Sequence, residues 1–184
     1  MPLRLDEIDN DCWTALENGA KEPECGFHFL TVASVDQQGK PQARTMVLRD
    51  VDRVNRTLEI HTDMRSPKWR ALGVNQDVTV LGYCNKIQLR LQGTAELHAA
   101  HSEVAANAWQ RLSPRTQQTY AGGAPGSDTA ISSGDKGDPE NNFGVMLIRI
   151  SLLDWCQLAR ENNQRALLHY RADGAFIGGK EVNP

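Results

Sequence analysis

The chain has 184 residues, of which 40% are apolar and 23% are charged, and its formal net charge is −3. This length and balance are typical of one globular domain over residues 1–184, and they exclude a disordered chain and a fibre. A slightly acidic chain has no overall positive field, which argues against nucleic acid and anionic membranes as partners.

The sequence shows no membrane span, no signal peptide and no metal-binding motif. No run approaches the roughly 18 apolar residues that a membrane span needs, and the N-terminal segment MPLRLDEIDND is too acidic for a signal peptide. The four cysteines are scattered and form no C-x-x-C pair, which favours free thiols. His98 and His101 are three residues apart, but no third ligand of fitting spacing stands nearby, so no metal site is predicted. We therefore expect a cytoplasmic protein.

The first half of the chain predicts one helix followed by strands. Apolar residues recur at helical spacing from Leu5 to Ala20, which predicts an amphipathic helix of about four turns. Strands are predicted at 27–35 and 42–51, and the short turn between them predicts a hairpin. Three more strands are predicted at 56–62, 77–84 and 86–97, and a short helix starting at Ser66 separates the first two of these.

The second half predicts a helix, a loop and further strands. The helix spans 101–112 and is stopped by Ser113 and Pro114. Residues 121–142 hold five glycines, two prolines and one large apolar residue, which predicts a mobile loop. Strands are then predicted at 143–155, 165–171 and 175–179.

The order of these elements predicts the fold class. We count six or seven strands, mostly joined by short turns, and few helices. The regular alternation of strand and helix that accompanies a parallel sheet is missing. A mainly β fold, an antiparallel split barrel with peripheral helices, is therefore favoured, and an open α+β sheet is the alternative.

The segment HTDMRSPKW, at the junction between a strand and a short helix, collects groups that could bind an anion. Ser66 is a good N-cap and Pro67 suits the first helical position. The first turn of a helix presents unpaired N–H groups and a positive dipole end, to which Lys68 and Arg65 would add charge, and Thr62 a hydroxyl. The segment therefore predicts a phosphate site. In the alternative, Ser66 only caps the helix and both cations are solvated.

Two other residues contribute to the argument. Arg44 falls on the same strand face as Met46 and Leu48, an unusual place for a charge unless an anion or a hydrogen-bonding group lies against it. Gln88 lies on the polar face of a strand whose other face is apolar, and alone it would be an ordinary solvent-facing residue.

Together, these segments resemble the pyridoxamine 5'-phosphate oxidase family of flavin mononucleotide (FMN)-binding split barrels. RTMVLR is similar to that family's R-x-V-L-x-[KR] strand, HTDMRSPK to its [YH]-T-[ND]-x-x-S-x-K phosphate segment, and IQLRLQG to its R-Q-V-R-[VI]-x-G strand. LLDWCQL resembles its F-W-Q-G segment, and Arg165 falls where the family has a late arginine. The resemblance covers roughly residues 27–170, and five weak motifs in the right order are fairly specific.

The resemblance implies FMN as cofactor and a set of residues that bind it. The flavin would be lined by Arg44, Thr45, Met46, Val47 and Leu48. Its phosphate would be held by Thr62, Ser66 and Lys68, with His61 alongside and Arg65 substituting for an arginine that the family usually has at Pro67. Gln88 would hydrogen-bond the ring, and Trp155 and Arg165 would reach it from the second subunit of a homodimer with FMN sites at the interface.

The chain departs from the family at the substrate. The oxidases grip their substrate with an R-x-H motif, and Glu161 and Asn163 occupy those places here. The resemblance therefore extends to the cofactor and not to pyridoxamine phosphate. An FMN-dependent oxidoreductase with an altered substrate grip is the first hypothesis, and no catalytic side chain is assigned, because the flavin itself transfers the electrons.

Two rival functions stay open from the sequence. A flavin-binding protein without turnover, acting as a store or a redox sensor, would also explain the altered grip. An oligonucleotide-binding barrel would need a basic groove with stacking aromatics. Aromatic residues make up only 6% of an acidic chain, which argues against that reading.

Overall fold

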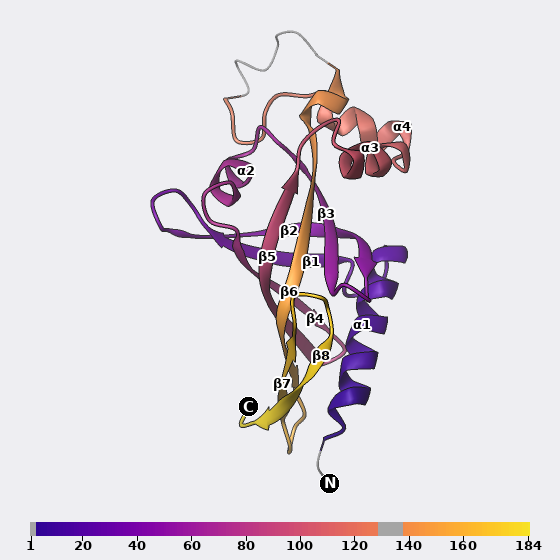
Figure 1. Cartoon of the computed structure of the whole chain (residues 1–184), viewed down its shortest axis with the longest axis vertical. Helices are drawn as coiled ribbons and strands as arrows, with labels where there is room; N and C mark the ends of the chain where they lie inside the picture. Colours follow the sequence, from indigo (N-terminus) through magenta and orange to yellow (C-terminus); the bar gives the residue numbers. More distant parts are fainter. Residues whose placement is uncertain (1–2, 129–137) are drawn as a thin grey trace.

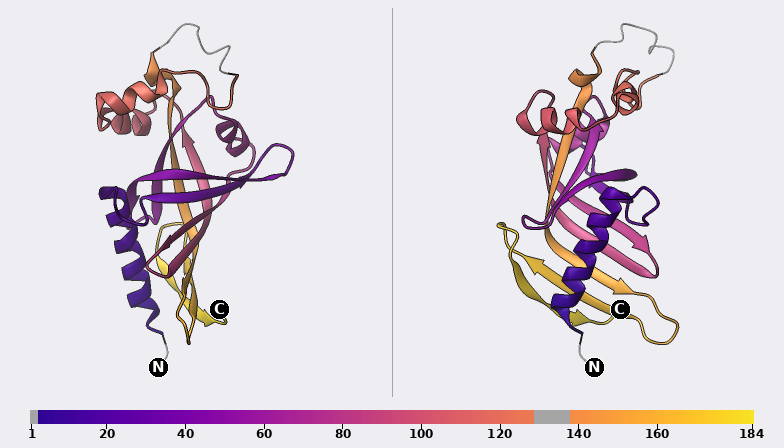
Figure 2. Two further views of the ribbon diagram at one scale, coloured as in Figure 1. Left: turned by 180° about the vertical axis from the view of Figure 1, so that it is seen from behind. Right: turned by 90° about the vertical axis from the view of Figure 1, so that its right-hand side faces the viewer.

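The structure is a computed structural model and describes residues 3–128 and 138–184. Figure 1 shows crossing strands at the centre, helix α1 (Leu5–Lys21) along one side, and helices α3 and α4 together at one end. The predicted first helix is confirmed, because the apolar stripe that begins at Leu5 packs Trp13 and Leu16 completely out of solvent. Figure 2 shows the same helix lying along the strands in two further views.

Eight antiparallel strands form one sheet within the described residues. Its order is β3-β2-β1-β4-β5-β6-β7-β8, and an additional pairing of β3 with β6 closes six of the strands into a barrel. The strands are β1 (Phe29–Val35), β2 (Pro41–Asp52), β3 (Thr57–Asp63), β4 (Asp77–Cys84), β5 (Ile87–His98), β6 (Phe143–Gln157), β7 (Gln164–Tyr170) and β8 (Phe176–Val182). The predicted antiparallel barrel is confirmed, and the open α+β alternative is wrong.

Strand β6 belongs to two parts of the sheet. Its first half, residues 143–149, pairs with β3 and closes the barrel, whereas residues 152–157 pair with β7. Strand β5 pairs with both halves, and the register shifts at Gln92 and Gly93. A Cβ atom on Gly93 would lie 2.2 Å from the carbonyl oxygen of Arg149, so this close approach requires glycine.

All eight segments predicted as strands form, more than the six or seven strands that we counted, and the last of them is longer than predicted. The turn between β7 and β8 contains Gly174 at φ +80°, a backbone conformation that glycine adopts without strain. The last strand then continues to Val182 rather than ending at residue 179. The predicted count of six or seven strands was therefore too low.

The remaining helices are short and lie outside the barrel. They are α2 (Pro67–Leu72), α3 (Glu103–Gln110), α4 (Pro114–Gln117), and the 3-10 helices η1 (Gln118–Tyr120) and η3 (Pro139–Asn142). Ser113 and Pro114 follow α3, which they were predicted to end, but they also have a second role. The hydroxyl of Ser113 accepts a hydrogen bond from Thr116 N at 3.2 Å, so these residues begin α4.

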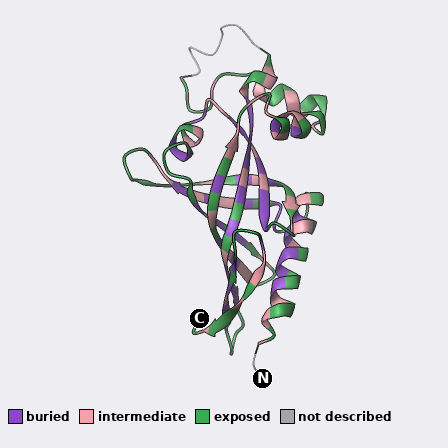
Figure 3. Cartoon of the chain, in the orientation of Figure 1, coloured by how far each residue is buried: buried purple, intermediate pink, exposed green. Residues whose placement is uncertain are grey.

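The core lies inside the barrel and under α1. In Figure 3 the buried residues follow the barrel strands and the inner side of α1, and the short helices at the end are mostly exposed. A smaller apolar cluster joins α3 to Phe143 and Val145 of β6. Of the predicted mobile loop, residues 129–137 lie outside the described residues. None of the described helices is long and apolar enough to cross a membrane.

Candidate cofactor site

Helix α2 begins as the sequence predicts, but its capping serine makes a different bond. Ser66 is the N-cap and Pro67 is the first helical residue. The Ser66 hydroxyl is buried and donates to the carbonyl oxygen of Asp63 at 2.6 Å, instead of accepting a bond from an N–H of the helix. The hydroxyl therefore fixes the turn before α2 and leaves its lone pairs to other donors.

Lys68 and Arg44 bring two positive charges to this turn. Lys68 Nζ donates to Ser66 Oγ at 3.1 Å, and Arg44 Nη1 donates to Ser34 Oγ at 2.9 Å and to the carbonyl oxygen of Val32 at 3.2 Å. Burial, together with the nearby charge of Arg44, lowers the pKa of Lys68, against the opposing charge of Asp63. Burial likewise lowers the pKa of Arg44. Both cations are therefore partly desolvated, which strengthens their attraction for an anion.

Thr62 supplies an unused hydroxyl beside the same turn. Its side chain is buried, and its Oγ1 has no hydrogen-bond partner within the described part of the chain. A buried polar group without a partner costs about 1–3 kcal/mol. A ligand oxygen would remove that cost, so Thr62, Ser66, Lys68 and Arg44 together form a group suited to a phosphate. We call these four residues the phosphate cluster.

Two residues predicted to help bind the phosphate are engaged elsewhere. The guanidinium of Arg65 donates to both carboxylate oxygens of Asp63, at 3.0 and 2.7 Å, and this carboxylate raises its pKa. His61 follows the pleat of β3 to the face opposite Thr62. There its Nε2 lies 2.7 Å from a carboxylate oxygen of Glu59, and its ring contacts Phe143 edge-on. The structure therefore places neither residue in the phosphate cluster.

Strand β2 offers less of the predicted flavin lining than the motif suggested. Side chains alternate along the strand, so Met46 and Leu48 are buried in the core. Thr45 and Val47 face outward, and Val47 pairs in register with the exposed Phe29 of β1. Only these two side chains and the backbone are placed to contact a ligand on the outer face.

Gln88 and Arg165 lie on the same outer face of the sheet, on either side of β6. Cys156 of β6 pairs in register with Gln88 of β5 and with Arg165 of β7, so all three share one face. One step along the strands, the carboxylate of Asp154 accepts bonds from Arg165 and from Arg90. We call Gln88, Arg90, Asp154 and Arg165 the ring cluster.

The structure buries Trp155, which the resemblance placed against the flavin of the second subunit. Trp155 pairs in register with Leu89 and Ala166, on the face opposite Gln88, and only 7% of it is exposed. It belongs to the main apolar core. The motif marks Trp155 in the sequence, but the pleat of β6 turns its indole inward.

Sequence reasoning missed Ser34, Arg90 and Asp154. A signal existed for Asp154, because a carboxylate interrupts the apolar run LLDWC, and a buried charge needs partners. Arg90 is one of the polar residues that alternate along β5, a pattern that by itself indicates only a solvent-facing side. No local signal marks Ser34, whose role depends on Arg44 reaching across from the neighbouring strand.

The phosphate and ring clusters do not meet within one chain. Arg44 pairs in register with Val32 on the core-facing side of the sheet, whereas Gln88 lies on the outer side. Strands β2 and β5 are also separated by β1 and β4 in the sheet order. A flavin that contacts both clusters would therefore need them from two different subunits.

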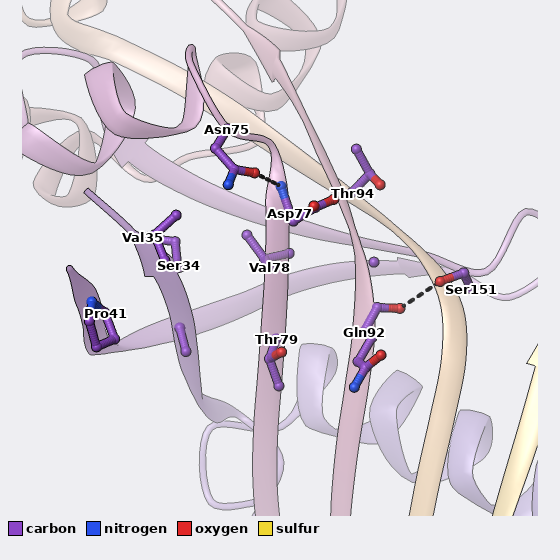
Figure 4. Close-up of a pocket in the computed structure, with 12 residues that line it drawn as sticks. Ser34, Val35, Pro41, Asn75, Asp77, Val78, Thr79, Gln92, Thr94 and Ser151 are labelled. Carbon is purple, nitrogen blue, oxygen red and sulfur yellow. Dashed lines mark hydrogen bonds between the residues drawn. The ribbon is translucent and has the colours of Figure 1, made fainter. Parts of the chain in front are cut away.

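The outer face also carries a separate groove with a volume of about 580 Å³. Figure 4 shows that Asp77 and Thr79 of β4 and Gln92 of β5 line it, with Ser34 and Val35 at one side. No residue of the predicted cofactor set lines this groove. Among the described residues, no three His, Cys, Asp or Glu side chains are grouped to hold a metal ion.

Sequence comparison relates most of the barrel to a known family. Residues 10–99, from α1 to the end of β5, match the description "Pyridoxamine 5'-phosphate oxidase, FMN-binding domain". Among curated protein sequences, no match was found. The matched residues include both the junction before α2 and the Gln88 strand.

Solved structures share the fold at low sequence identity. A pyridoxamine 5'-phosphate oxidase-related, FMN binding protein from Nostoc punctiforme has a TM-score of 0.78 and 23% identity, over 95% of this chain and 96% of that chain. PhzG from Burkholderia lata, solved with tetrahydrophenazine-1-carboxylic acid, has a TM-score of 0.69 and 15% identity, over 98% and 90%. A protein related to general stress protein 26 from Clostridium acetobutylicum has a TM-score of 0.56 and 13% identity, over 86% and 93%. The chain therefore shares the split-barrel fold of these proteins, and its residues 10–99 are similar to the FMN-binding domain of the pyridoxamine 5'-phosphate oxidase family.

Proposed function

We propose that the protein is an FMN-dependent oxidoreductase that works as a homodimer, with FMN bound between the subunits. The observation that carries the proposal is the phosphate cluster, in which two partly desolvated cations and an unpaired buried hydroxyl surround one turn. Such a set of hydrogen-bond donors suits a phosphate monoester. A cytoplasmic location stays a prediction.

In this proposal the chain binds and orients the cofactor, and the flavin supplies the redox chemistry when bound. Lys68, Arg44 and the hydroxyl of Thr62 hold the phosphate, and Ser66 fixes the ammonium of Lys68. Gln88 donates or accepts a hydrogen bond at the ring through its amide. Arg165 adds a cation at the same end.

The absorption spectrum of the purified protein tests this proposal. We expect a yellow preparation that absorbs blue light. A colourless preparation should turn yellow when FMN is added, and the protein should stay yellow after the free FMN is removed by desalting. Extraction of the bound flavin by heat should release FMN rather than riboflavin, because the phosphate cluster selects the phosphate. A colourless protein that takes up no added FMN would contradict the proposal.

A flavin-binding protein without turnover is the second candidate. It is favoured by the residues at the two positions of the family's substrate motif, Glu161 and Asn163, which are both exposed. The side chain of Asn163 accepts a hydrogen bond from Ala159 N at 2.8 Å. Steady-state assays with amine substrates and with electron acceptors separate the two candidates. An oxidoreductase shows turnover that depends on the substrate, and a store or sensor shows none.

An exposed aromatic strip on the outer face supports the homodimer. Phe29 of β1 is 58% exposed and Tyr83 of β4 is 57% exposed, and Leu81 extends the strip. Tyr83 pairs in register with Gln88, and Phe29 with Val47, so the strip lies on the same outer face as the ring cluster. Large apolar side chains gathered on one face are typical of a protein interface.

Replacing Tyr83 by Asp should turn the dimer into a monomer and abolish FMN binding with it. A carboxylate in a buried interface loses its water without gaining a partner. Light scattering coupled to size-exclusion chromatography measures the mass, and flavin fluorescence measures the binding. Val54→Asp is the matched control, because Val54 is exposed in the turn between β2 and β3, away from the strip. A wild-type protein that is already monomeric would refute the homodimer.

A further inference from the structure

The carboxylate of Asp154 holds two arginines from the neighbouring strands. Arg165 of β7 donates through Nε to Oδ1 at 2.8 Å and through Nη2 to Oδ2 at 2.7 Å. Arg90 of β5 donates through Nη2 to Oδ2. Asp154 is only 3% exposed, whereas both arginines reach the surface.

The arrangement leaves charge and donors free on the outer face. Burial opposes ionisation of Asp154, but the hydrogen bonds and charges of Arg165 and Arg90 outweigh it, and its pKa lies below the ordinary value. One carboxylate neutralises only one of the two guanidinium groups, so the cluster keeps a net positive charge. A guanidinium held through Nε and Nη2 also turns its Nη1 edge away from the carboxylate.

The rigidity of this arrangement distinguishes it from an ordinary surface pair. A free arginine samples many rotamers, and fixing it costs side-chain entropy. The two parallel bonds to Asp154 restrict the guanidinium plane of Arg165 before any ligand arrives. Because Gln88 and Arg165 flank Cys156 in register, that plane is fixed on the same face as the Gln88 amide, with β6 between them.

We propose that Asp154 is a positioning residue of the cofactor site, which fixes Arg165, with Arg90 as a second anchor, so that Arg165 presents its free N–H groups to the flavin ring beside Gln88. The inference rests on the proposed function and adds to it a residue that never touches the flavin. It also assigns the ring cluster to ring recognition, apart from the phosphate cluster.

Binding of FMN and of riboflavin to the Asp154→Asn variant tests the inference. Asparagine keeps the size of the side chain but removes the charge and one of the two acceptor oxygens. We expect the Kd of both flavins to rise about tenfold, because a charge-assisted hydrogen bond is lost and Arg165 is released. A variant of the phosphate cluster should change the Kd of FMN and leave that of riboflavin unchanged. An equal loss of affinity for FMN and for riboflavin therefore identifies the ring end of the site. Asp173→Asn is the matched control, since Asp173 pairs with Arg171 in the same way at an exposed turn.

A double-mutant cycle with Arg165→Ala shows whether Asp154 acts through Arg165. If it does, adding Asp154→Asn to Arg165→Ala raises the Kd no further. Additive losses, or an Asp154→Asn variant that melts earlier but binds both flavins as the wild type does, would overturn the inference and leave the proposed function standing. If Asp154→Asn does not fold, Arg165→Lys, which keeps the charge and loses the fork, should raise both Kd values. A wild-type protein that binds neither flavin refutes both proposals.

Discussion

Lys68→Ala weakens FMN binding by roughly one to two orders of magnitude and leaves riboflavin binding unchanged, if the phosphate cluster holds the cofactor. The ammonium of Lys68 is partly desolvated and lies on the Ser66 hydroxyl, within the field of Arg44. Removing it takes away one of the two charges that compensate the phosphate. Riboflavin lacks the phosphate, so its affinity does not depend on this charge. Quenching of flavin fluorescence on titration measures both constants.

Arg70→Ala provides the control for Lys68→Ala. Arg70 lies in the last turn of the same helix α2 and is exposed, so its replacement removes a positive charge from α2 without touching the cluster. We expect its FMN affinity to match the wild type. If Lys68→Ala and Arg70→Ala bind FMN equally well, Lys68 is an ordinary solvated lysine and the phosphate does not lie at this turn.

Arg56→Met destabilises the protein by about 3–5 kcal/mol, because it leaves a buried carboxylate without its partner. Arg56 Nη2 donates to Asp9 Oδ2 at 2.8 Å, and Tyr170 Oη donates to the other oxygen at 2.6 Å. The guanidinium lies 5.0 Å from the ring centre of Trp13 and 4.9 Å from that of Tyr170. These contacts join α1 to the turn before β3 and to strand β7. The urea midpoint and slope of unfolding measure the loss.

Two further variants separate the buried charge from the lost packing. Arg171→Met removes an exposed pair with Asp173, and we expect it to leave the urea midpoint close to that of the wild type. In the double variant Asp9→Asn with Arg56→Met, the uncompensated charge is gone, so part of the stability should return. Equal losses for Arg56→Met and Arg171→Met would contradict the role given to the buried pair.

Local patterns were sufficient to predict most of the elements. The strand predicted at 77–84 has the observed bounds, because a run of β-branched residues stands there between two turns. The start of α2 follows from the Ser-Pro pair, since both positions are set by backbone preferences of adjacent residues. The barrel class follows from the number of strands and their short connections.

The composition of the site depended on distant parts of the chain and was predicted less well. Trp155 lies in the segment LLDWC of β6, where apolar residues stand on both sides of the pleat and do not show which side is the core. The neighbours of Gln88 depend on the register between β5 and β6, which shifts at Gly93. The sequence gives no sign that Arg65 is paired. The turn before α2 brings the Asp63 carboxylate to its guanidinium, and this turn geometry is visible only in the structure.

Strand β6 closes the barrel and is the last of its six strands in the chain, which has a consequence for folding during synthesis. Strands β1 to β5 are synthesised before residue 143, so the nascent barrel has unpaired edges on β3 and β5 until β6 leaves the ribosome. Unpaired strand edges attract other extended chains. The 44 residues between β5 and β6 (99–142) are therefore a delay during which this fold is open to aggregation, and a chaperone that shields strand edges would act in that interval.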